Sequence, residues 1–202
     1  QPNNPYNQRG ADYIASFEII RSDYYNGKAT DFSEVTLQYY SQKIPLQNKV
    51  SVEVAAAILK LRTNGTLNFS QFIQNTSLSA VAKKTLEDVL FNPAGSSDEV
   101  FKEAIKQKVD QIGGADLVAA EKELLLSLLA ISYHLADSPA ALLRSGERRG
   151  CWISGPYGQG PGTPAQCAAA SAFVGGVIGW SICGILCGFG GAIIGGIAGA
   201  LS

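Results

Sequence analysis

The chain has 202 residues, a formal net charge of −1 and one histidine, His134. This length suits one domain with an appendage. A near-neutral charge gives no general attraction to nucleic acid or to anionic lipid. A single histidine also excludes a two-histidine zinc site within one chain. We therefore expect no metal, no cofactor and no nucleic-acid partner.

The sequence offers little basis for catalysis. It has no Gly-x-Ser-x-Gly elbow and no phosphate-binding loop of the P-loop type. His134 and Asp137 are three residues apart and could touch on a helix. A histidine beside an acid at a helix end is a far commoner arrangement than a catalytic pair, so we expect the protein not to be an enzyme.

The charged residues are unevenly distributed. Every Asp, Glu, Lys, Arg and His lies before Cys151, and the rest of the chain has none. This asymmetry places a boundary near Gly146–Gly150, and together with the local composition it predicts four parts. They are a polar N-terminal arm over residues 1–10, an amphipathic helical bundle over 11–145, a Gly/Pro-rich linker loop over 146–166 and an apolar segment over 167–202.

Apolar residues in the second part recur at helical spacing between turn-forming pairs. We expect helices over residues 11–25, 31–40, 51–62, 78–91 and 116–137, and a short one after Asn68. The run Ser96–Glu99 matches a capping box and should open another helix, with Phe101 and Ile105 on its apolar face, that closes at Gly113. No run alternates with the period of a strand, so the sequence predicts an all-α bundle of six to seven helices.

Small residues recur at every fourth position from Cys167 onward, and residues four apart lie on one helix face. Each interior glycine costs a helix about 1 kcal/mol in water, whereas in lipid small residues let helices approach closely. The pattern therefore predicts a membrane-competent segment that packs through a glycine face. This face contains Gly175, Gly179, Gly184, Gly188, Gly191, Gly195 and Gly199.

The length of this segment limits its shape. One continuous helix from Cys167 to Ser202 would be about 54 Å long, well beyond the roughly 30 Å of a bilayer's hydrocarbon core. It must tilt steeply or break, and we favour a helical hairpin that breaks at Gly188–Gly191. Trp180 is a candidate interfacial anchor. Three arginines before the segment could anchor it too or form an exposed loop cluster: Arg144, Arg148 and Arg149.

The four cysteines, Cys151, Cys167, Cys183 and Cys187, all lie in the uncharged region. An even number predicts disulfides, with three possible pairings. We favour Cys151–Cys167, while the other two either pair elsewhere or stay reduced. The chain starts with Gln1, which fits a removed signal peptide as well as other trimming. We expect an exported, membrane-associated protein of the cell envelope or the extracellular space.

The repeated Gly-x-x-x-Gly pairs, such as Gly175–Gly179 and Gly184–Gly188, resemble the helices of two-peptide bacteriocins and glycine-zipper membrane proteins. The overall layout is similar to colicin-type pore-forming domains, in architecture only. These resemblances imply a non-enzymatic secreted protein whose C-terminal segment inserts into or perforates a membrane. Its partner would be a lipid bilayer or a membrane protein, and the glycine face could support self-association.

Two other readings remain open. The chain could be an anchored structural or accessory subunit of a cell-envelope membrane complex, docked through the same segment. It could also be a self-contained soluble domain with a glycine-rich core.

Overall fold

A computed structural model describes residues 3–25, 54, 57, 69–91, 97–137, 152–155, 158–183, 188, 191 and 192. This part of the chain forms six helices and one pair of strands. They are α1 (Asn7–Tyr25), α4 (Phe69–Gln74), α5 (Ala80–Phe91), α6 (Asp98–Gly114), α7 (Ala119–Asp137), β1 (Trp152–Gly155), β2 (Gly158–Pro161) and α9 (Pro164–Cys183). The all-α fold class is confirmed. The helices expected over 31–40 and 51–62 lie outside the described residues, except for Val54 and Ala57, which are helical.

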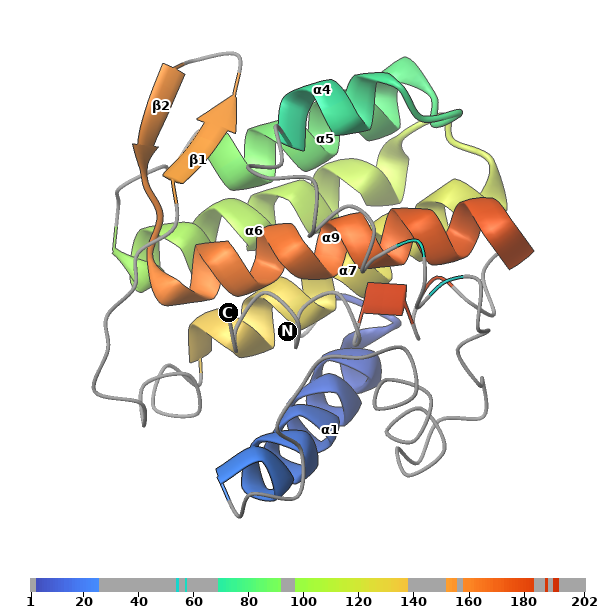
Figure 1. Cartoon of the computed structure of the whole chain (residues 1–202). Coiled ribbons are helices and arrows are strands. Elements are labelled where there is room, and N and C mark those ends of the chain that lie inside the picture. The colour runs from blue at the N-terminus through green and yellow to red at the C-terminus, as the bar shows by residue number, and fades with distance from the viewer. Residues whose placement is uncertain are drawn as a thin grey trace.

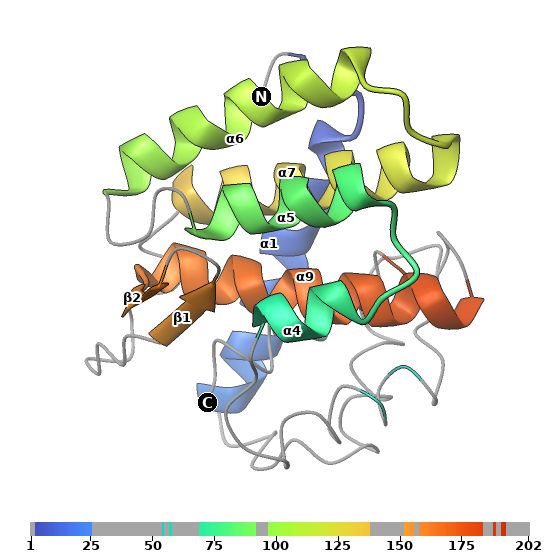
Figure 2. The same ribbon diagram turned by 90° about the horizontal axis from the view of Figure 1, so that it is seen from above.

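Two helices, α7 and α9, run side by side through the centre of the molecule (Figures 1 and 2). Helix α6 and the obliquely placed α1 pack on α7, whereas α4 and α5 lie along α9. The apolar helix of the C-terminal part is therefore a core element of the bundle rather than an appendage beside it.

Helix α7 is enclosed on nearly every side. Its residues Leu124, Leu128, Ile131 and Leu135 are all buried. Leu125 is buried as well, because neighbouring helices cover more than one face of α7. A hydrogen bond connects the N-terminus of α5 to α7. The buried Glu121 carboxylate accepts it from the Ser79 amide at 2.7 Å.

Helix α6 has the apolar face that the sequence predicts. Its residues Phe101, Ile105, Val109 and Ile112 are buried. The N-cap is Ser97, one residue later than the start of the expected capping box, and its hydroxyl accepts a hydrogen bond from the Val100 amide.

Two expected loop regions are ordered instead. Helix α1 begins at Asn7, inside the predicted polar arm, and the Asn7 amide donates to the carbonyl of Asn4. The predicted linker loop contains the antiparallel hairpin β1–β2, in which Gly155 pairs with Gly158. The hairpin is short and Gly-rich, so it has no alternating apolar pattern from which it could be predicted. Only two residues connect its strands, and this short connection sets their register.

Candidate functional site

Helix α9 starts with a reciprocal cap. The Thr163 amide donates to Gln166 Oε1 at 2.9 Å, and the Gln166 amide lies 3.3 Å from Thr163 Oγ1. The Thr163 hydroxyl also donates to Asp98 at the start of α6, at 2.8 Å. These contacts start α9 at Pro164, three residues before the boundary we expected. The sequence does carry the signal, because Thr-Pro-Ala-Gln is a capping box with proline at the first helical position.

The stretch Ala165–Ile182 of α9 is long and apolar enough to cross a membrane, and it is the one such stretch among the described residues. About two thirds of it is buried inside the bundle. Its buried side chains include the small Ala168 and Ala172 and the large Phe173 and Val177. A helix of this composition is membrane-competent, but the core helix of a soluble bundle has the same composition.

After α9 the chain folds back on itself. Gly188, Gly191 and Ala192 are helical, and the Ala192 Cβ lies 3.3 Å from the position that a Cβ on Gly176 would occupy. One straight helix would place residues 176 and 192 about 24 Å apart. The expected hairpin therefore agrees with these contacts. The expected break does not, because Gly188 and Gly191 already belong to the returning helical segment.

The two arms of this hairpin touch backbone to backbone. A Cβ added to Gly191 would lie 2.1 Å from the carbonyl oxygen of Gly175 and 3.3 Å from the Gly179 Cα. No side chain fits at that distance, so glycine is needed here. Gly175 and Gly179 of the predicted packing face therefore meet Gly191 of the same face, within a single chain.

Leucines of α7 cover this glycine contact from the other side. A Cβ on Gly176 would lie 2.7 Å from Leu128 Cδ2, and one on Gly188 would lie 3.4 Å from Leu124 Cδ1. The small residues of the hairpin therefore leave space that the leucine side chains of α7 fill. The spacing of small residues could not predict the contact with α7, since it indicates a smooth helix face but not which element packs on it.

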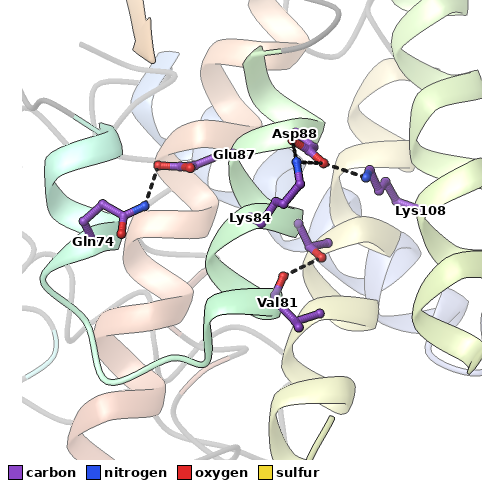
Figure 3. Close-up of polar contacts among 7 residues, drawn as sticks. Gln74, Val81, Lys84, Glu87, Asp88 and Lys108 are labelled. Atoms are coloured by element: carbon purple, nitrogen blue, oxygen red, sulfur yellow. Dashed lines mark hydrogen bonds and ion pairs between the residues drawn. The ribbon is translucent and has the colours of Figure 1, made fainter. Parts of the chain in front are cut away.

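Two neighbouring carboxylates of α5 hold the outer helices together (Figure 3). Glu87 accepts hydrogen bonds from Ser70 and Gln74 of α4, at 2.7 and 3.1 Å. Asp88 accepts from Lys84 at 2.9 Å and from Lys108 of α6 at 2.8 Å. Because adjacent residues point in different directions on a helix, α5 is fastened to α4 on one side and to α6 on the other.

The surroundings of Asp88 favour its charged form. Burial raises the pKa of the Asp88 carboxyl, but the hydrogen bonds and charges of Lys108 and Lys84 outweigh burial and hold it below its usual value. Asp88 therefore keeps its charge to a lower pH than an ordinary aspartate does.

His134 and Asp137 do not contact each other by hydrogen bonding in this fold. His134 Nε2 lies 3.1 Å from Asn7 Oδ1. Asp137 forms an ion pair with Lys102 of α6, whose ammonium also lies 5.3 Å from the centre of the Tyr133 ring. Both groups thus take part in contacts between helices.

Trp180 is half-buried and packs against the core, so in this fold it is covered in part by the bundle. Cys167 is disulfide-bonded. Cys183 ends α9. The remaining predicted residues lie outside the described part of the chain: Arg144, Arg148, Arg149, Cys151, Gly184, Cys187, Gly195 and Gly199.

Comparisons of this chain with protein-family models, with curated proteins and with solved structures found no match.

Proposed function

We propose that this protein is a soluble carrier of a membrane-inserting helical hairpin. In the closed state, α9 and the segment that contains Gly188 and Gly191 are covered by the amphipathic helices. On opening, the hairpin enters a lipid bilayer and perforates it, in the manner of a secreted pore-forming protein. The observation that carries the proposal is the contact between Gly175 of the largely buried α9 and Gly191, which is itself buried.

Physical reasoning supports this use of the contact. In water an interior glycine weakens a helix, so a core built on glycines is a costly way to stabilise a soluble bundle. In lipid no hydrophobic force drives helices together, and close backbone packing is the main attraction available to them. A hairpin that already packs through glycines keeps its internal contact when its surroundings change from protein to lipid. The disulfide at Cys167 fits the oxidising compartment in which secreted proteins fold.

The docked-subunit reading receives less support. A segment that anchors the chain to a membrane partner should present its apolar face outward. The described part of α9 faces α7, α5 and α4 of its own chain instead. We therefore develop only the insertion proposal.

Dye release from vesicles of phosphatidylglycerol and phosphatidylethanolamine measures perforation and so tests the proposal. Two exposed apolar residues provide a test substitution and its matched control. Ile182, in the last turn of α9, is 44% exposed, and Val118, before α7, is 66% exposed. Lysine at either position is tolerated by the closed bundle. Within an inserted hairpin a lysine costs up to about 2.5–3.5 kcal/mol, depending on its depth.

We expect the full chain to release dye, Ile182→Lys to release it at least about tenfold more slowly, and Val118→Lys to match the unsubstituted chain. Equal release by the two lysine variants would contradict insertion of α9. Absence of release by the unsubstituted chain at both pH 7 and pH 5 would leave α9 as the core helix of a soluble domain.

A further inference from the structure

Residues Asn3–Gly10, which we call the N-terminal latch, contact α7 beside the face that covers the hairpin. The Arg9 guanidinium donates to Glu123 Oε1 and to Ser127 Oγ, each at 2.6 Å. These two α7 residues are one helical turn apart and therefore share a face. The arginine thus ties the latch to a polar stripe of α7.

The latch also touches the backbone of α7. The buried Asn4 side chain donates to the Leu126 carbonyl at 2.7 Å, and its Oδ1 accepts from the Tyr6 amide at 2.9 Å. A Cβ added to Gly10 would lie 2.4 Å from the Ala130 carbonyl oxygen and 2.3 Å from His134 Cδ2. Gly10 is therefore required for the approach of α1 to α7.

The two faces of α7 differ in chemistry. The face toward the latch carries Glu123, Ser127 and His134, which can hydrogen-bond to water when they are exposed. The face toward the hairpin carries Leu124 and Leu128, which lie against the glycines of the hairpin. Separation of the latch therefore exposes polar groups that water can satisfy, whereas separation of α7 from the hairpin exposes leucines.

Among the described elements, α1 packs mainly on α7. The latch therefore holds α7 by a face that neighbours the one covering the hairpin glycines. We propose that the N-terminal latch is an autoinhibitory contact. It keeps α7 over the glycine-packed hairpin, and its release is the step that frees the hairpin. This inference rests on the proposed membrane function.

Gly10→Ala tests the latch by steric means, without removing a charge. The added methyl group clashes with the α7 backbone and forces α1 away. Gly113→Ala is the matched control, because a Cβ at Gly113 meets nothing within 4 Å. We expect Gly10→Ala to speed hydrogen exchange in both α1 and α7, and to release dye from the same vesicles about tenfold faster. Gly113→Ala should leave the rate of dye release unchanged.

A second pair of variants covers the case in which Gly10→Ala does not fold. Arg9→Gln removes the ion pair to α7. Its control is Gln8→Ala, because exposed Gln8 bonds only to Asp12 within its own helix among the contacts described. We expect about two- to fivefold faster dye release by Arg9→Gln and none of this gain by Gln8→Ala.

The possible outcomes separate this inference from the proposed function. If α1 exchanges faster while the protection of α7 or the rate of dye release stays unchanged, the latch is refuted. If the unsubstituted chain releases dye but neither latch variant does so faster, the latch again fails and the proposed function stands. If no variant releases dye at either pH, although exchange shows α1 and α7 open, the proposed function itself fails.

Discussion

At the scale of single residues, the contact between the two arms of the hairpin requires glycine at position 191. Gly191→Ala places a methyl group where the Gly175 carbonyl oxygen would be 2.1 Å away, so the two arms of the hairpin must move apart. We expect a loss of about 2–3 kcal/mol in the free energy of unfolding, measured by urea denaturation. Gly113→Ala is the control, and it should stabilise the chain by about 0.5–1 kcal/mol, since it sits in a helix with open space around it. Equal effects of the two substitutions would mean that the arms do not touch at Gly191.

At the scale of elements, the docking of α1 on α7 should depend on pH through His134. Burial lowers the pKa of the His134 imidazole below its usual value, and the Asp137 carboxylate opposes this shift. Other charged groups on the packed elements are Lys102 of α6, paired with Asp137, and Arg9 of α1, paired with Glu123. The folded chain therefore holds His134 neutral where the unfolded chain takes up a proton. Stability is full above about pH 6.5 and falls as the pH drops through the folded pKa.

His134→Gln keeps an N–H donor for Asn7 Oδ1 but does not titrate. Urea denaturation at pH 7 and pH 5 should show a smaller loss of stability in this variant than in the unsubstituted chain. The carboxylates Asp88 and Asp137, whose pKa values are lowered by their lysine partners, lose their contribution only below about pH 4 in both chains. An identical loss in the two chains would show that His134 does not control this contact.

The same elements show how far the sequence could be interpreted. Apolar residues at helical spacing located α5, α6 and α7, and the buried residues of α6 follow that spacing. The β1–β2 hairpin was not predicted, because its strands have no alternation of apolar and polar residues. Only a two-residue connection marks it in the sequence. The latch was also missed. In the sequence, Asn4 and Arg9 resemble solvent-exposed polar residues. In the fold, they bond to the Leu126 carbonyl and to Glu123 of α7. Long-range polar partners of this kind leave no local signal in a sequence.

At the scale of the whole molecule, α6 packs on one side of α7 and α9 on another, with α4 on the far side of α9 from α7 (Figure 2). The charge asymmetry of the sequence predicted that the uncharged part has a role of its own. It did not predict that α9, the described helix of this part, would also lie in the core of the fold. In the proposed mechanism both states use the same apolar residues, so the closed bundle and the inserted hairpin compete for α9.

The most direct measurement follows Trp180, which lies in α9 near its end. Trp152→Phe leaves it as the single tryptophan, since the chain has two. With this variant, vesicles whose acyl chains carry bromine should quench the Trp180 emission strongly, because bromine quenches only at contact and α9 must be in the hydrocarbon for contact to occur. Adding Ile182→Lys should abolish most of the quenching. Emission that is identical in brominated and unbrominated vesicles, at every bromine depth and at both pH 7 and pH 5, would contradict entry of α9 into the bilayer.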